Sequence, residues 1–311
     1  TCFMSNWVIG GLKKQEWITH SYDKWSEKYG ITVVHDTATD IDADAKVVKT
    51  AGGLNLNYDR CVISPGIDFR YDQMEGYDAA AAEKVPHAWQ AGPQTATLRK
   101  QLEEMKDGGL FVICPPPNPF RCPPGPYERV SLVANYFKNH KPKSKILVLD
   151  AKDRFSKQGL FTAGWEQHYG YGTDDSMIEW RPKSNDGLVR AVDADKRMVM
   201  TEFEEIEADV LNFVPAQKAG KIAHVAGCAD DSGWCPVDHL TWESKRRPGI
   251  HVIGDAAIQS PLPKSGYAAN SEAKVCASAI VAMLKGEEPS APSWVNTCYS
   301  LVSPTHGISV A

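Results

Sequence analysis

The chain has 311 residues, of which 42% are hydrophobic and 23% charged, and its 34 Lys and Arg against 39 Asp and Glu give a net charge of −5. This length predicts about two domains with a hydrophobic core. The composition excludes a disordered chain and a basic nucleic-acid-binding surface, and no apolar run reaches the roughly 18 residues of a membrane span.

The first 70 residues carry short strand signals. Residues 31–42 and 46–50 contain β-branched, apolar stretches broken by polar turn formers, and residues 55–64 continue in this style up to the turn dipeptide Pro65-Gly66. The pattern predicts a sheet-rich first region.

A helix, a buried strand, a helix and a second buried strand follow. We expect helices at about 94–105 and 126–140, and strands at the wholly apolar run 110–114 and at 145–150. Strand, helix and strand in this order form the βαβ unit of a doubly wound parallel sheet.

The last third predicts further strands and one long helix. Strand-like runs occupy 198–203, 206–214 and 221–225, and a buried strand at 249–254 ends at Asp255. We expect the helix at about 264–284, because five apolar residues repeat along one face there, namely Ala269, Ala273, Cys276, Ile280 and Leu284.

The loop inside the βαβ unit is rich in proline. A dinucleotide-binding unit has glycines here, because backbone N–H groups must approach a pyrophosphate. Proline lacks that N–H, and this loop holds Pro115, Pro116, Pro117, Pro119, Pro123 and Pro124. The loop therefore argues against nicotinamide binding at this unit.

Two side chains near the start of the second helix are candidates for chemistry. Cys122 lies just before the helix start, where the helix dipole favours a reactive thiolate. Glu128 lies in the first turn, where acidic residues are common for electrostatic reasons alone, so its position does not by itself indicate a base.

The Gly254-Asp255 pair is a weaker signal. It ends a buried strand and precedes a helix within about ten residues, which is how flavoproteins with two dinucleotide-binding domains place an Asp on the FAD ribityl chain. Lys264 at the helix start is a candidate for the positive charge that stabilises reduced flavin, although a solvated Lys before a helix is the commoner case.

Seven segments in chain order resemble the flavoprotein subunit of flavocytochrome c sulfide dehydrogenase, within the glutathione-reductase-like flavoproteins. They are TCFMSN at 1–6, YDRCVISPGIDFRYD at 58–72, FRCPPGPYER at 120–129, DSGWCPVD at 231–238, PGIHVIGDA at 248–256, PKSGYAANSEAKV at 263–275 and NTCYS at 296–300. The proline loop with its cysteine is the most specific of these segments.

The resemblance implies a redox-active disulfide between Cys122 and Cys298, with Glu128 handling protons, and FAD joined covalently to Cys2. It also implies the remaining flavin contacts: Pro65, Gly66, Gly254, Asp255, Lys264, Ser265 and Gly266. Cys61, Cys114 and Cys276 are interpreted as inert core thiols, and the roles of Cys228 and Cys235 stay open. The eight cysteines show no metal-site spacing, so we expect no metal.

The implied fold is α/β, with two dinucleotide-binding-like, Rossmann-type domains of the glutathione reductase family in three layers, the first domain incomplete. We expect four segments: 1–75, the first part of the FAD-binding domain; 76–216, a second dinucleotide-like domain without a nicotinamide site; 217–288, the second part of the FAD-binding domain; and 289–311, the start of a C-terminal interface domain. The family's glycine-rich loop is absent from this sequence. We therefore interpret the chain as a fragment without the first βαβ unit and the C-terminal end.

The implied activity is oxidation of sulfide to sulfur or polysulfide, with electrons passing to a cytochrome c subunit. No C-x-x-C-H haem attachment sequence occurs here, so the haem is expected only on that partner. Disulfide chemistry and a cytochrome c partner favour the periplasm. Two alternatives stay open: a sulfide:quinone oxidoreductase on a membrane surface, and a non-catalytic flavin-binding electron-transfer scaffold.

Overall fold

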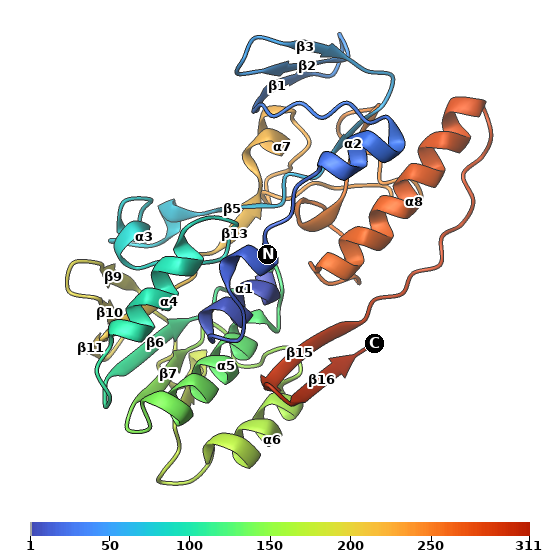
Figure 1. Cartoon of the computed structure of the whole chain (residues 1–311). Helices are drawn as coiled ribbons and strands as arrows, with labels where there is room; N and C mark the ends of the chain where they lie inside the picture. The colour runs from blue at the N-terminus through green and yellow to red at the C-terminus, as the bar shows by residue number, and fades with distance from the viewer. Residues whose placement is uncertain (1) are drawn as a thin grey trace. The chain divides into compact units, whose positions relative to one another are not determined.

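The structure, a computed structural model, describes residues 2–311, with side chains from Met4 onward, and divides the chain into two compact units (Figure 1). Unit 1 comprises residues 1–18, 69–217 and 297–311, and unit 2 comprises residues 19–68 and 218–296. Both units are built from separate stretches of chain. The four-segment division expected from the sequence stays a prediction.

Unit 1 is organised around a parallel sheet of four strands in the order β12-β6-β7-β8. The strands are β6 (Leu110–Cys114), β7 (Lys145–Leu149), β8 (Ile178–Arg181) and β12 (Val210–Phe213). Helix α5 (Gly125–His140) connects β6 to β7, and α6 (Gln158–Tyr169) connects β7 to β8. The predicted βαβ unit is confirmed, and the fold is α/β with a Rossmann-type parallel sheet, as expected.

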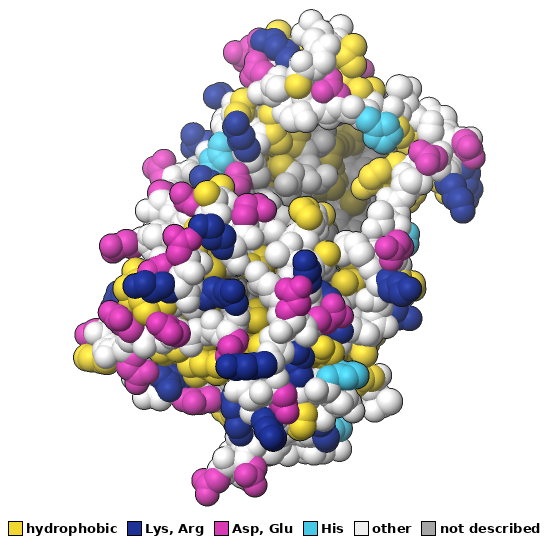
Figure 2. All heavy atoms as spheres, turned by 60° about the vertical axis from the view of Figure 1, so that its left-hand side comes forward, with side chains coloured by type: hydrophobic (Ala, Val, Ile, Leu, Met, Phe, Trp, Pro, Cys, Tyr) yellow, Lys and Arg dark blue, Asp and Glu magenta, His cyan; other side chains and the backbone are white. Residues whose placement is uncertain are grey.

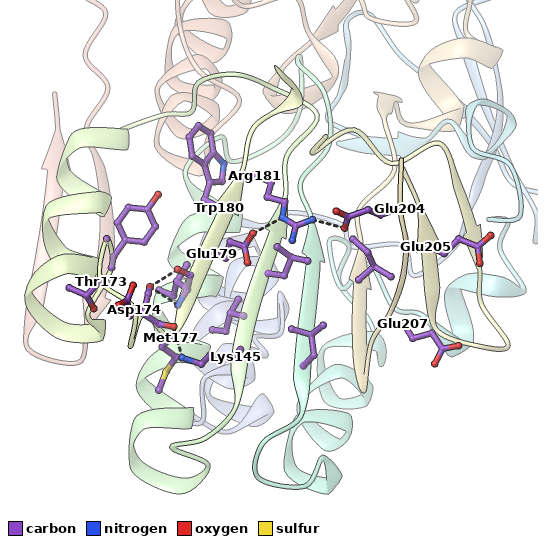
Figure 3. Close-up of a pocket in the computed structure, with 18 residues that line it drawn as sticks. Lys145, Thr173, Asp174, Met177, Glu179, Trp180, Arg181, Glu204, Glu205 and Glu207 are labelled. Carbon is purple, nitrogen blue, oxygen red and sulfur yellow. Dashed lines mark hydrogen bonds and ion pairs between the residues drawn. The ribbon is translucent and has the colours of Figure 1, made fainter. Parts of the chain in front are cut away.

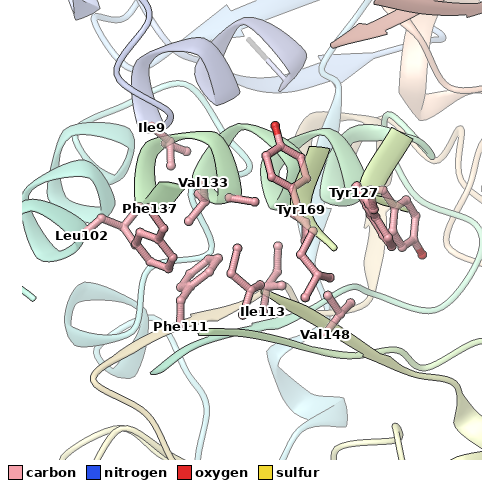
Figure 4. Close-up of a cluster of buried hydrophobic side chains, with 14 of the residues drawn as sticks. Ile9, Leu102, Phe111, Ile113, Tyr127, Val133, Phe137, Val148 and Tyr169 are labelled. Carbon is pink, nitrogen blue, oxygen red and sulfur yellow. The ribbon is translucent and has the colours of Figure 1, made fainter. Parts of the chain in front are cut away.

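Helices cover one face of this sheet. Alternate strand residues such as Phe111, Ile113 and Val148 point to that face, because side chains of a strand alternate between its two sides. They pack against α5, α6, α4 (Gln94–Glu104) and α1 (Cys2–Ile9), as Figure 4 shows for Ile9, Leu102, Tyr127, Val133, Phe137 and Tyr169.

A small antiparallel sheet packs against the opposite face and completes the three layers. It consists of β9 (Ala191–Asp193), β10 (Met198–Met200) and β11 (Glu205–Glu207) in the order β11-β10-β9. Val192 and Val199 pack there against Val112, Leu147 and Leu211 of the parallel strands.

A C-terminal hairpin packs against the helical layer of unit 1. It consists of β15 (Cys298–Ser303) and β16 (His306–Val310). Val302 joins the hydrophobic cluster beneath α5 and α6, and the Tyr169 hydroxyl donates to the Val302 carbonyl at 2.6 Å. A Cβ added at Gly164 would lie 2.4 Å from a Val302 methyl, so only glycine lets the hairpin approach α6 this closely.

Unit 2 contains short strands and one long helix. A meander of β1 (Ala38–Asp42), β2 (Val47–Thr50) and β3 (Asn55–Asn57) precedes β4 (Cys61–Ile63), which pairs in parallel with β14 (Ile250–Val252). Helix α8 (Gly266–Lys285) confirms the long amphipathic helix, and α2 (Asp23–Tyr29) is a further short helix. Strands β5 (Ile67–Phe69) and β13 (Gln217–Ala219) pair with each other and contain the points where the chain passes between units.

Two local predictions were wrong. Residues 221–225 form the helix α7 (Lys221–Val225), with Ala223 buried, because five residues are too few for periodicity to separate a strand from a helix turn. Residues 31–37 form no strand, and β1 begins only at Ala38.

Charged side chains of both signs are interspersed on the face that Figure 2 shows. No helix among residues 2–311 is long and apolar enough to cross a membrane.

Candidate functional site

The proline loop holds Cys122 against the start of α5. Cys122 is 7% exposed and adopts a left-handed φ of 56°, and its carbonyl accepts from the Gly125 N–H at 2.8 Å. A Cβ added at Gly125 would lie 3.0 Å from Cys122 Sγ and 3.0 Å from the Trp89 ring, so this glycine makes room for the sulfur. Cys122 therefore lies just before a helix start, as the sequence predicted.

Glu128 lies in the first turn of α5 and is buried, with 1% exposure. Its Oε1 accepts from the Leu301 backbone N–H of β15 at 2.8 Å, and its Oε2 accepts from Asn6 Nδ2 of α1 at 3.2 Å. Asn6 also donates to the Gly125 carbonyl at 2.9 Å. One carboxylate thus joins three elements of unit 1.

Burial raises the pKa of Glu128 to about 7, although the Leu301 N–H, Asn6 and the Lys157 charge act in the opposite direction. Such a carboxyl exchanges a proton near neutral pH, which an exposed glutamate does not. The first-turn position is therefore more than a favourable dipole contact.

Cys298 begins β15 and is half-buried, three residues before the Leu301 N–H that binds Glu128. Burial raises the pKa of its thiol, the Lys157 charge and hydrogen bond lower it, and the Glu128 charge raises it. Cys298 thus lies within the electrostatic reach of both side chains.

Lys157 is a residue of this neighbourhood that the sequence did not indicate. It precedes α6, and its Nζ donates to the Cys298 carbonyl at 2.6 Å and to Ser300 Oγ at 3.1 Å. A lysine in a polar loop between a strand and a helix carries no sequence signal, since its partner lies 141 positions further on.

The structure therefore brings Glu128, Cys298 and Lys157 together in unit 1 and places Cys122 at the start of the same helix that carries Glu128. Cys298 carries a free thiol in this structure. The disulfide between Cys122 and Cys298 stays a prediction.

The predicted flavin residues lie in unit 2, apart from Cys2, whose side chain lies outside the described residues. Pro65 and Gly66 follow β4, and Gly254 follows its parallel partner β14, with positive φ values of 68° at Gly66 and 73° at Gly254. Both strands therefore end in turns that only glycine adopts without strain.

The start of α8 assembles three more of these residues. Ser265 caps the helix, its Oγ accepting from the Ala268 N–H at 3.1 Å. Lys264 is buried beside the Trp234 ring and donates to the carbonyls of Asp255 and Ala257 at 2.7 Å each, and burial lowers its pKa to about 8. A Cβ added at Gly266 would meet nothing within 4 Å, so the helix start is open.

The polar groups here fit a flavin nucleotide. Glu272 is fully buried; its Oε2 accepts from the Gly254 N–H at 2.6 Å, whereas its Oε1 has no hydrogen-bond partner among the described residues. The start of a 20-residue helix also offers N–H groups to an anion. The two turns, Asp255 and the first turn of α8 thus supply the groups that could hold FAD.

A buried ion pair between Asp150 and Lys152 lies at the edge of the parallel sheet where Rossmann-type domains bind dinucleotides. Asp150, at the end of β7, is fully buried and accepts from Lys152 Nζ at 2.6 Å, Tyr127 Oη at 2.6 Å and Trp180 Nε1 at 3.0 Å. Lys152 also donates to the Pro116 carbonyl of the proline loop at 2.9 Å. A cavity of about 300 Å³ at this edge is lined by Pro115 and Pro117, which lack N–H donors.

A larger cavity of about 850 Å³ lies elsewhere in unit 1, along the edge strand β8 (Figure 3). Arg181 crosses it, donating to Glu179 at 2.5 Å and Glu204 at 2.8 Å. No predicted site residue lines this cavity. Its size therefore does not identify it as the functional site.

Two family models match the chain. Residues 95–215 match the central domain of the flavoprotein chain of flavocytochrome c sulfide dehydrogenase, and residues 290–311 match the flavin-binding domain of flavocytochrome c sulphide dehydrogenase. The matched ranges contain Cys122 and Glu128 in the first case and Cys298 in the second.

Curated relatives include two mitochondrial sulfide:quinone oxidoreductases. The mouse protein is 22% identical over 269 residues, covering 84% of this chain and 58% of its own length. The Schizosaccharomyces pombe protein is 23% identical over 228 residues, covering 70% of this chain and 48% of its own length. The chain spans about half the length of these relatives.

Solved structures show the same fold. The sulfide:quinone oxidoreductase of the hyperthermophilic bacterium Aquifex aeolicus has a TM-score of 0.78 at 19% identity, covering 100% of this chain and 78% of that one. An NAD-dependent persulfide reductase from A. fulgidus has a TM-score of 0.67 at 19% identity, covering 96% and 54%. Together with the two family models, these likenesses confirm the expected resemblance: the chain is similar to flavoproteins of the sulfide dehydrogenase and sulfide:quinone oxidoreductase type.

Proposed function

We propose that the protein oxidises sulfide through a Cys122–Cys298 disulfide and passes the electrons to FAD. The observation that carries this proposal is Glu128, whose buried carboxylate links the helix behind Cys122 to the strand that begins with Cys298. A proton-exchanging group held near two cysteine-bearing segments suits thiol–disulfide chemistry at neutral pH, because thiols lose and regain protons in it.

The proposed reaction balances in three steps. Hydrosulfide attacks one sulfur of the disulfide and forms a persulfide, while the other cysteine leaves as a thiolate with the electron pair of the broken S–S bond. A second hydrosulfide removes the outer sulfur as a polysulfide and frees the first thiolate. The two thiolates then reform the disulfide and release two electrons.

Each protein group has a defined part in these steps. Glu128 accepts a proton when the sulfur species ionise and returns it to the product, because its pKa of about 7 lies near the working pH. FAD, when bound, accepts the two electrons as a pair and passes them on singly. Pro65, Gly66, Gly254, Asp255, Lys264, Ser265 and Gly266 are proposed to hold it, with a covalent bond to Cys2.

The proposed acceptor is a cytochrome c subunit that carries the haem, with the complex in the periplasm; the family models named for flavocytochrome c support this choice. The curated relatives support a second candidate, a quinone, since they are named sulfide:quinone oxidoreductases. Anaerobic reduction by sulfide followed by mixing with cytochrome c or a soluble ubiquinone analogue decides between them. The acceptor that reoxidises the flavin at a rate matching turnover is the physiological class.

Cysteine variants test the sulfur chemistry itself. Cys122→Ser and Cys298→Ser are expected to abolish flavin reduction by sulfide, while Cys276→Ser, buried on α8, leaves it unchanged. Full reduction in either of the first two variants would contradict the disulfide mechanism and favour the electron-transfer scaffold. Flavin fluorescence that stays with the denatured polypeptide, and is lost in Cys2→Ser, would establish the covalent bond.

A further inference from the structure

Asn6 is fully buried in α1 and uses both ends of its side-chain amide. Its Nδ2 donates to the Gly125 carbonyl at 2.9 Å and to Glu128 Oε2 at 3.2 Å. Its Oδ1 accepts from Arg129 Nε at 2.9 Å. One amide of α1 thus contacts a carboxylate and a guanidinium that are neighbours on α5, both of them buried.

Arg129 determines which way this amide points. A guanidinium carries N–H donors and no acceptor, so it can bind only the oxygen of the Asn6 amide. Three further oxygens hold the guanidinium in place: the His87 carbonyl at 3.0 Å, the Ala88 carbonyl at 2.8 Å and Asn212 Oδ1 at 2.8 Å. A reversed amide would turn its NH₂ against the N–H groups of Arg129 and its oxygen against the carboxylate of Glu128. The NH₂ of Asn6 is therefore directed at Glu128.

Asn212 fixes the far end of this chain of contacts. It is fully buried in β12, and its Nδ2 donates to the carbonyls of Pro86 at 2.6 Å and His87 at 3.0 Å, so its oxygen faces Arg129. From Asn212 through Arg129 to Asn6, each orientation follows from the one before it, and all these residues belong to unit 1. A buried polar network whose members are paired in this way holds a single arrangement.

We propose that Asn6 is a positioning residue for the proposed sulfide oxidation, because it holds the Glu128 carboxylate in the orientation in which Glu128 exchanges protons with the sulfur species. The inference rests on the proposed function, since it needs Glu128 as the proton-handling group. The Asn6 NH₂ and the Leu301 N–H bind different oxygens of this carboxylate, at 3.2 and 2.8 Å. One donor on each oxygen fixes the plane of the carboxylate, and only the Asn6 donor comes from a side chain that another side chain orients.

The contact also gives the sign of a measurable effect. An N–H donor favours a charged carboxylate over the neutral acid. The Asn6 hydrogen bond accordingly lowers the pKa of Glu128, whereas burial raises it. Loss of the donor should therefore move the titration of Glu128 to higher pH, by about one pH unit, which is the scale of one hydrogen bond to a charged group.

Asn6→Ser and Asn6→Asp separate this role from a structural one. Serine is too short to reach Glu128 and removes the donor without adding a charge. Aspartate keeps an oxygen for Arg129 but turns a second oxygen towards Glu128, so it supplies the measurement if the smaller serine destabilises unit 1. Asn139→Asp, which makes the same change at an exposed position of α5, is the matched control.

Infrared difference spectra of the flavin-loaded protein, recorded without sulfide between pH 5 and pH 10, measure the titration directly. The protonated carboxyl band of Glu128 is identified by its loss in Glu128→Gln. Its midpoint is expected to rise by about one pH unit in Asn6→Ser, to rise further in Asn6→Asp, where a second negative charge lies beside Glu128, and to stay unchanged in Asn139→Asp.

Flavin reduction by sulfide shows whether this orientation matters for the reaction. The ratio of variant to wild-type rate at each pH cancels the ionisation of sulfide itself, and in both Asn6 variants it should change over the pH range in which the infrared midpoint moves. An unchanged infrared midpoint in both Asn6 variants would overturn the inference, and so would a shifted midpoint with a constant rate ratio. Failure of sulfide to reduce the wild-type flavin would instead refute the proposed function, whereas the infrared midpoint would still report on the contact between Asn6 and Glu128.

Discussion

The buried Glu128 makes a quantitative prediction about stability. Its pKa is raised from 4.5 to about 7, so the folded protein holds this proton more tightly than the unfolded chain does. The contribution of Glu128 to the free energy of unfolding therefore falls as the pH rises from about 4.5 to about 7, by about 3 kcal/mol, because each pKa unit corresponds to about 1.4 kcal/mol.

Glu128→Gln removes this titration and costs one hydrogen bond. The variant amide still offers an oxygen to the Leu301 N–H, but its NH₂ then faces Asn6 Nδ2, which is itself a donor. Asn6 cannot simply flip, because its Oδ1 accepts from Arg129 Nε at 2.9 Å. Relative to the wild type, we expect the variant to lose about 1 kcal/mol in free energy of unfolding at pH 5. Above pH 8, where the buried carboxylate of the wild type is fully charged, we expect the variant to be more stable by about 2 kcal/mol.

Urea unfolding of both proteins between pH 5 and pH 9 measures the effect. The difference between the two curves isolates Glu128, since all other groups titrate in both proteins. Glu166→Gln, an exposed glutamate on α6, is the matched control and should show no crossover. A difference that stays constant across this range would refute the assignment of a raised pKa to Glu128.

Three further variants probe how the site is held. Gly164→Ala should destabilise unit 1 by about 1–3 kcal/mol in thermal unfolding, because the new methyl group would lie 2.4 Å from a Val302 methyl, and Val302→Ala should restore it. Arg129→Lys should lower the free energy of unfolding by about 3–5 kcal/mol, because the fully buried guanidinium donates to four oxygen acceptors that one ammonium cannot reach together. An unchanged free energy of unfolding would contradict this role of Arg129. Lys152→Met should cost a similar free energy of unfolding, because it leaves the buried Asp150 carboxylate without its cation, and adding Asp150→Asn should recover part of it. A purely additive double variant would argue against direct coupling.

The layered core of unit 1 was predictable because its strands are buried on both faces. Runs such as residues 110–114 and 145–149 are almost wholly apolar, and few other structures bury both sides of a five-residue segment. Three-residue strands such as β4 and β14 left a weaker signal, and the five residues of α7 were too few to reveal a helical period.

The position of Cys122 was predictable from local chemistry, whereas its neighbourhood was not. Proline and glycine fix a loop and a helix start within ten residues, so the cysteine could be placed before α5. The contact between Glu128 and Leu301 joins positions 173 apart. Only packing of the β15–β16 hairpin on the helices creates that contact. The proposed pairing of Cys122 with Cys298 also joins distant positions, so it could come only from the resemblance.

The proposed sulfur chemistry lies at the usual functional edge of a Rossmann-type sheet. Ligands of such folds bind beyond the carboxyl ends of the strands, where loops lead into helix N-termini. Cys122 follows β6 and Lys157 follows β7, two paired neighbouring strands, and both residues adopt left-handed φ values just before their helices. Prolines remove the N–H donors that would hold a phosphate there, while the strained cysteine and lysine supply a sulfur and a cation at the same edge. The hairpin then brings Cys298 to that cation, because the Lys157 ammonium donates to the Cys298 carbonyl at 2.6 Å.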